Sequence, residues 1–181
     1  MTKQTPSHWK ANLLDVRLPR WHELPDMDIY MDQLIQLIDH YTLDLYLSED
    51  NKKGLTPSMV NNYVKLQLVP KPNKKKYNKQ HLARLLAITI LKKGFDIPSI
   101  KQGIEYQTNI TTSKDAYNFF CNHIEQTIDF FINSDKKEVS IEHIKGDFAP
   151  IQMACTTLIA KIIAEKELND LLQQTKETSH D

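Results

Sequence analysis

Residues 56–101 read TPSMVNNYVKLQLVPKPNKKKYNKQHLARLLAITILKKGFDIPSIK, and this stretch decides the fold. Thr56 followed by Pro57 is a typical helix start, because a hydroxyl caps free backbone N–H groups and proline fits the first helical position. The prolines of LVPKPNKKKY exclude a helix there, and Asn78 can cap the next helix, over 79–93. The stretch therefore predicts a short helix, a loop or tight hairpin, and a largely apolar central helix.

The short helix, expected over 57–66, has two different faces. Its apolar side chains gather on one side, at Met59, Val60, Tyr63 and Leu66. Polar side chains follow the i, i+3, i+4, i+7 spacing of the other side, at Ser58, Asn61, Asn62 and Lys65. This polar face carries no acidic residue, so it can approach a polyanion without repulsion.

Helical patterns continue on both sides of this stretch, which predicts a mainly all-α fold. Residues 1–27 contain three prolines and two tryptophans and are expected to form an irregular arm. From Asp28 onward, apolar residues recur at three- and four-residue spacing. Gly94 is placed to cap the central helix, and one more helix follows it. We assign 28–107 to one domain.

The C-terminal part is predicted to be a second, purely helical domain over 108–175. Thr112 and Asp115 have the spacing of a capping box, and two long apolar stripes follow, at 117–131 and 151–172. These stripes predict a helical hairpin or bundle. Residues 176–181 are expected to be a frayed tail.

The charge is neutral in total but unevenly distributed. Residues 52–93 hold 11 of the 23 basic residues and none of the 23 acidic ones, so the rest of the chain carries 12 basic and 23 acidic residues. A basic window between acidic flanks favours a polyanionic partner more strongly than a pI near 7.1 would suggest.

Several functional classes find no support in the sequence. The chain has no apolar run of the ~20 residues that span a bilayer and no signal-peptide core, which predicts a cytoplasmic protein. The seven histidines lack metal-ligand spacing, and there is no phosphate-binding glycine loop or nucleophile motif. We expect no enzyme activity, no metal and no cofactor. Cys121 and Cys155 lie in helical apolar patterns and are expected to be buried thiols.

The order of motifs resembles the winged helix-turn-helix of MerR-type regulators. TPSMVNNYVKLQLVPKP is similar to the recognition helix and wing entry of that family, and YNKQHLARLLAITILKKGFDIPSIK to the helix pair that follows. Together with LPRWHELPDMDIYMDQL, these motifs cover about 18–107 and resemble a bacterial domain-of-unknown-function family with a MerR-like architecture. The resemblance implies a DNA-binding transcriptional regulator with a wing rich in lysine.

The expected contacts to double-stranded DNA follow from this resemblance and from side-chain chemistry. An asparagine amide can pair with adenine in the major groove, and lysines can neutralise phosphates, which positions the protein without reading sequence. The residues expected to contact DNA are Ser58, Asn61, Asn62, Lys65, Lys71, Lys74, Lys75, Lys76 and Lys79.

Two alternatives stay open at this point. Asn61 stands where MerR-type proteins usually have arginine, and Gln67 where they usually have glycine. These departures leave room for a protein-interaction module whose basic face docks an acidic partner. The apolar stripes of the C-terminal helices suit either a homodimer or packing within the chain, and no feature identifies a small-molecule effector.

Overall fold

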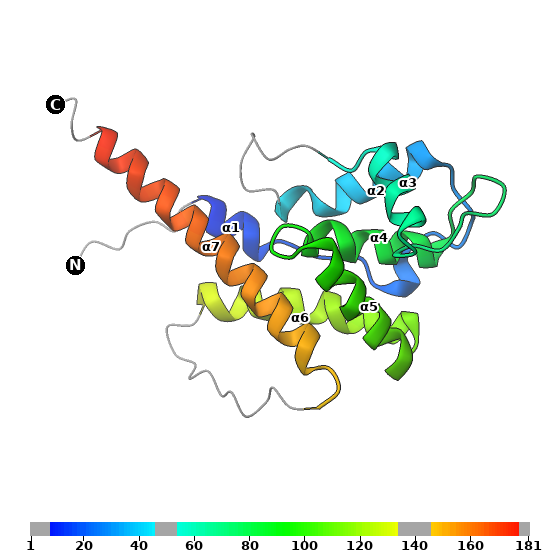
Figure 1. The fold of residues 1–181 in the computed structure, drawn as a ribbon. Helices are drawn as coiled ribbons and strands as arrows, with labels where there is room; N and C mark the ends of the chain where they lie inside the picture. Colours follow the sequence, from blue (N-terminus) through cyan, green and yellow to red (C-terminus); the bar gives the residue numbers. More distant parts are fainter. Residues whose placement is uncertain (1–7, 46–53, 134–145, 178–181) are drawn as a thin grey trace.

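The computed structural model describes residues 8–45, 54–133 and 146–177 (Figure 1). Within these ranges it contains helices and two isolated antiparallel bridges but no strand. The prediction of a mainly all-α fold is confirmed. The helices are α1 His8–Leu14, α2 Met31–Thr42, α3 Pro57–Lys65, α4 Lys79–Leu91, α5 Ile97–Ile110, α6 Ser113–Asn133 and α7 Ala149–Glu177, with short 3-10 turns η1 Trp21–Glu23 and η2 Leu43–Leu45.

The predicted helix starts are confirmed by their capping bonds. The Thr56 hydroxyl accepts a hydrogen bond from the Met59 N–H at 3.2 Å, which begins α3. The Asn78 side chain accepts from the first backbone N–H groups of α4. Thr112 accepts from the Asp115 N–H at 3.1 Å, which begins α6. Each cap acts over two or three residues, so local sequence is enough to place it.

α4 lies at the centre of the fold, as its apolar composition predicted. It packs against α2, α6 and α7, and its buried positions point to several sides rather than to one face. A single cluster of buried residues runs from Trp9 to Ile162. One hydrophobic core therefore extends through both 28–107 and 108–175. The two cysteines, on α6 and α7, are buried as predicted.

The N-terminal arm is not irregular throughout, which corrects the expectation for 1–27. Residues 8–14 form α1, and the Trp9 indole N–H donates to Asp170 on α7 at 2.6 Å. Arg20 forms a bidentate pair with Glu125 on α6, at 2.8 and 2.5 Å. The hydrogen bonds that the Arg20 guanidinium donates to Glu125 raise the pKa of Arg20. These contacts join residues more than 100 positions apart, so no local pattern announces them.

Gly94 does not act as the left-handed cap that its position suggested, because its φ is not positive. A Cβ at this position would lie only 3.1 Å from a methyl carbon of Leu158 on α7. The residue is small because the turn between α4 and α5 passes close to α7.

The segment between the two predicted C-terminal stripes and the predicted tail fall partly outside the described residues, at 134–145 and 178–181. α7 continues to Glu177. Its last turns project beyond the body of the molecule (Figure 1). None of the helices in the described ranges is long and apolar enough to cross a membrane.

Candidate nucleic-acid interface

α3 presents the two faces that its spacing predicted. Val60 and Tyr63 are buried against the core, whereas Leu66, which was expected on the same apolar face, follows the end of α3 and is 40% exposed. The polar face is exposed along its whole length, at Ser58, Asn61, Asn62 and Lys65. The structure therefore brings the predicted helix residues together on one solvent-facing surface.

The end of α3 is held by a Schellman motif that sets the start of the hairpin. The Leu68 N–H donates to the Tyr63 carbonyl at 2.9 Å, and the Gln67 N–H donates to the Val64 carbonyl at 3.1 Å. Gln67 adopts a left-handed conformation, with φ 62°. Glycine adopts this conformation more readily than any residue with a Cβ. The helix therefore ends in the usual geometry, but with an unusual residue.

Residues 66–78 form a hairpin whose turn consists of two lysines. Asn73 and Lys76 exchange backbone hydrogen bonds at 3.1 and 2.8 Å, and Lys74 and Lys75 between them have φ of 48° and 63°. Two central residues with positive φ define a type I′ turn, which strongly prefers Asn-Gly. Both lysines are exposed. The turn thus places two charges at its tip in a conformation that lysine disfavours.

The hairpin is attached to the body at its base. Leu68 and Val69 are buried, and the Tyr77 ring is only 3% exposed. Ile29, just before α2, exchanges two backbone hydrogen bonds with Tyr77, at 2.9 and 2.8 Å. The Tyr77 ring also packs edge-on against His81. The tip consequently projects from a firm base at the same end of the molecule as α3 (Figure 1).

Two of the predicted contact lysines have partners that the sequence did not reveal. The Lys76 ammonium lies 5.3 Å from the centre of the Tyr30 ring, and Lys79 forms an ion pair with Asp26. Tyr30 is 54% exposed, so it adds an aromatic surface beside the hairpin. An exposed tyrosine next to a helix start gives no signal of this role in the sequence.

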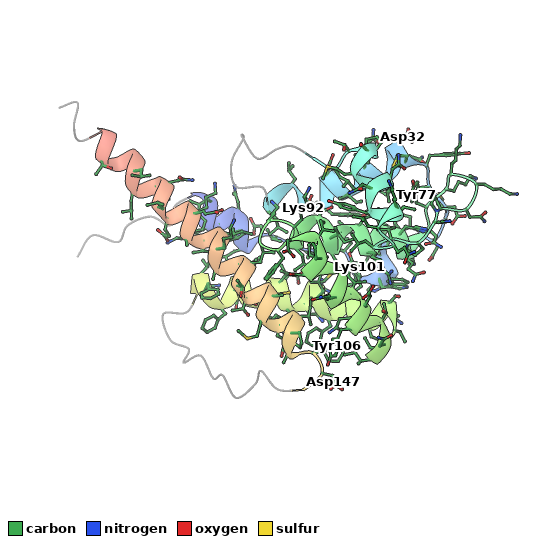
Figure 2. All side chains as sticks on the ribbon, in the orientation of Figure 1. Asp32, Tyr77, Lys92, Lys101, Tyr106 and Asp147 are labelled. Atoms are coloured by element: carbon green, nitrogen blue, oxygen red, sulfur yellow. The ribbon has the colours of Figure 1, made fainter. Side chains whose placement is uncertain are left out.

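The basic window of 52–93 does not form one surface. Lys65, Lys71, Lys74 and Lys75 are exposed around α3 and the hairpin. Arg84 instead reaches the Leu68 carbonyl at 3.4 Å, and Lys93 reaches the Leu45 carbonyl at 2.8 Å. Lys92 follows α4 at the end away from Tyr77 (Figure 2). Lys52 and Lys53 lie outside the described residues.

This surface gathers the types of side chain that contact nucleic acids in other proteins. The two asparagine amides offer donors and acceptors for base edges, the exposed lysines offer charge for phosphates, and Tyr30 offers a face for stacking. Among the described residues, no group of three or more His, Cys, Asp or Glu side chains is placed to hold a metal ion.

Acid should destabilise the folded protein, because His81 is buried beside Tyr77 at the foot of the hairpin. Burial lowers the pKa of His81 below its ordinary value of 6.5. The unfolded chain therefore takes up a proton before the folded chain does, and stability is complete above about pH 7 and falls as the pH drops below 6.5. His81→Asn keeps an acceptor for the Asn78 N–H and should flatten this fall. Urea titrations between pH 7.5 and 5 measure the free energy of unfolding of the unchanged protein and of the variant. The same fall with pH in both proteins would contradict the prediction.

The fold and this surface define a helical protein in which a basic hairpin stands beside an exposed polar helix face. Residues 19–120, more than half of the chain, match the family described as domain of unknown function (DUF1836). The chain belongs to this family, which confirms the resemblance to a domain-of-unknown-function family; the match itself gives no MerR-like architecture. No curated protein and no solved structure matches the chain. The matched residues include α3, the hairpin and α4 entirely.

Proposed function

We propose that this protein binds double-stranded DNA and regulates transcription through a MerR-like winged helix-turn-helix. In this proposal, α2 and α3 are the two helices of the motif, and the hairpin of residues 66–78 is the wing. α3 enters the major groove with Asn61 and Asn62 against base edges, where each amide can pair with adenine. Such a role places the protein in the bacterial cytoplasm.

The lysines of the hairpin and of α3 contact the DNA backbone. Lys65, Lys71, Lys74 and Lys75 are exposed and neutralise phosphates. Lys76 approaches the backbone next to Tyr30. Lys79 contributes less, because Asp26 already offsets its charge.

The single observation that carries the proposal is the composition of the hairpin turn. Lys74 and Lys75 both have positive φ. This left-handed conformation costs a residue with a Cβ about 1 kcal/mol or more in free energy. Strained conformations of this kind concentrate at functional sites. A turn that contacts only solvent gains nothing that would offset this strain, whereas a turn that contacts phosphates gains from both positive charges.

Fluorescence anisotropy with labelled genomic fragments tests the proposal. If four lysines per chain neutralise phosphates, the log–log dependence of affinity on salt has a slope of about −4 per bound chain. A selection of bound fragments then identifies the operator, and A·T pairs are expected beneath Asn61 and Asn62. The absence of salt-sensitive binding to any duplex at 50 mM salt, a condition that favours such contacts, would overturn the proposal.

A second candidate function is the docking of an acidic protein partner on the same surface. The contact between Asp26 and Lys79 already provides an example of a carboxylate bound beside the hairpin. This alternative would be favoured if a complex with a protein is recovered from cell extract after nuclease treatment and the purified chain binds no duplex. The two candidates are distinguished by whether nuclease treatment releases the partner.

We also propose that the chain forms a homodimer through the end of α7. Glu167 and Asp170 face α1, where they bind Lys10 and Trp9. Three leucines in the same part of α7 are exposed, at Leu168, Leu171 and Leu172. Their i, i+3, i+4 spacing forms one apolar stripe, and a second copy can cover it.

The dimer is tested by sedimentation velocity. The wild-type chain should sediment with the mass of two chains, and Leu168→Glu/Leu172→Glu should sediment as one, because a buried pair of carboxylates opposes association. Leu168→Met/Leu172→Met keeps the stripe apolar and should remain dimeric. A monomeric wild-type chain at tens of micromolar would contradict the proposal.

A further inference from the structure

A cavity of about 420 Å³ lies between α5 and the helices α4, α6 and α7. Its walls come from α4, α5, α6 and the first turns of α7, together with Trp21. This volume lies in the range of small-molecule sites, about 300 to 1,000 Å³. The cavity lies apart from the exposed polar face of α3 and the hairpin tip, and neither of these lines it.

One end of the cavity is polar. It lies where α4 and α6 begin and α5 ends, since the Gln80 amide on α4 donates to the Ser113 hydroxyl on α6 at 3.2 Å. Gln107, in the last turns of α5, is 8% exposed. Both polar atoms of its amide lack a hydrogen-bond partner among the described residues. Buried amides are usually paired, so this one is available to a bound molecule.

Arg84 lies one helical turn after Gln80 on α4 and adds a positive charge to the cavity wall. It is half-buried. Its guanidinium donates to the Leu68 carbonyl at 3.4 Å, and no carboxylate in the described part of the chain pairs with it. Burial lowers the pKa of this guanidinium, because the charge is partly removed from water. A half-buried guanidinium of this kind favours a carboxylate ligand.

The other end of the cavity is apolar. It is formed by the end of α4, the turn that follows, and the first turns of α5 and α7, with Leu91, Phe95, Ile100, Phe120, Ile151 and Ala154 in its wall. An apolar cavity of this kind favours an apolar molecule over water.

Gly103 also lines the cavity and is itself exposed, on its open side. It lies in the middle of α5, where glycine is about 1 kcal/mol less favourable than alanine. A Cβ at this position would meet no atom within 4 Å, so no neighbour requires glycine there. Its spacing places it on the helix face shared by Ile100 and Gln107. A large side chain at position 103 would therefore fill the cavity.

We propose that this cavity binds a small amphipathic carboxylate, with the carboxylate at Arg84 and Gln107 and the apolar body toward Leu91 and Phe120. The ligand class is a medium-chain acid with a single negative head group. The guanidinium forms paired hydrogen bonds with the carboxylate, and the Gln107 amide N–H gains an acceptor. The proposal stands without DNA binding, since it concerns a different surface.

Isothermal titration calorimetry with octanoate at pH 7.5 tests the site. One octanoate should bind per chain, and octan-1-ol, which has the same tail without the charge, should bind at least about tenfold more weakly. Arg84→Gln should reduce this difference to about threefold or less, because only the charged contact separates the two molecules.

Two substitutions at Gly103 locate the binding. Gly103→Phe should weaken octanoate at least about tenfold by occupying the cavity, whereas Gly103→Ala should keep the affinity within about threefold. Ala154→Leu fills the same cavity from α7 and replaces Gly103→Phe if that variant does not fold, as judged by circular dichroism. The proposal is overturned if octanoate does not bind at millimolar concentration, if both filled variants bind it as tightly as Gly103→Ala, or if octan-1-ol binds equally well.

Discussion

Lys74→Asn/Lys75→Gly should make the protein more stable and at the same time weaken the proposed binding to DNA. Both lysines sit at positive φ in a two-residue turn, and Asn-Gly is the preferred sequence for that turn. Relief of the left-handed conformation should raise the free energy of unfolding by about 1 to 2 kcal/mol. Removal of two phosphate contacts should make the log–log salt slope shallower by about 2.

This double substitution separates folding from function, because its two effects have opposite signs. Urea denaturation measures the first effect, and anisotropy titrations from 50 to 200 mM salt measure the second. Gln67→Gly is the matched control, since it relieves another left-handed residue of the same hairpin without a change of charge. It should gain about 1 kcal/mol and leave the salt slope unchanged. An unaltered slope in the lysine variant would remove the tip of the hairpin from the DNA interface.

Tyr77→Ala should destabilise the protein more than any surface change near the hairpin. The ring is almost completely buried and packs against His81 with centroids 5.5 Å apart. Loss of a buried aromatic ring typically costs about 3 to 5 kcal/mol. This is a large share of the about 5 to 15 kcal/mol that stabilises most domains. The urea midpoint should fall accordingly, and DNA binding should weaken because the hairpin loses its base.

Tyr77→Phe is the control for this prediction. No hydrogen bond of the Tyr77 hydroxyl is found within the described ranges, so the phenylalanine variant should lose less than about 1 kcal/mol. Burial raises the pKa of Tyr77, so the hydroxyl of the unchanged protein is neutral at pH 7.5 and its removal in Tyr77→Phe changes no charge. A similar loss in both variants would assign the effect to the hydroxyl, and no loss in either would show that the ring does not hold the hairpin.

Much of the fold follows from short-range rules. The caps at Thr56, Asn78 and Thr112 involve residues two or three positions apart, and the apolar spacing of α3 and α6 is visible over a few turns. The left-handed end of α3 is an exception, because Gln67 occupies the position that glycine usually takes, but the other features are set by neighbouring residues. These features were therefore predictable. The helix at 8–14 was not, because its stability depends on contacts with α6 and α7.

The candidate site shows where such rules end. The charge pattern and the polar face of α3 were visible in the sequence, since both concern neighbouring residues. Three other features could be seen only in the packed structure. They are the ion pair of Lys79 with Asp26, the cation–π contact of Lys76 with Tyr30 and the cavity lined by Arg84. The physical reason is the range of the forces involved. Caps and helical periodicity act within one or two turns, whereas charge pairing and burial depend on which distant segments the core brings together.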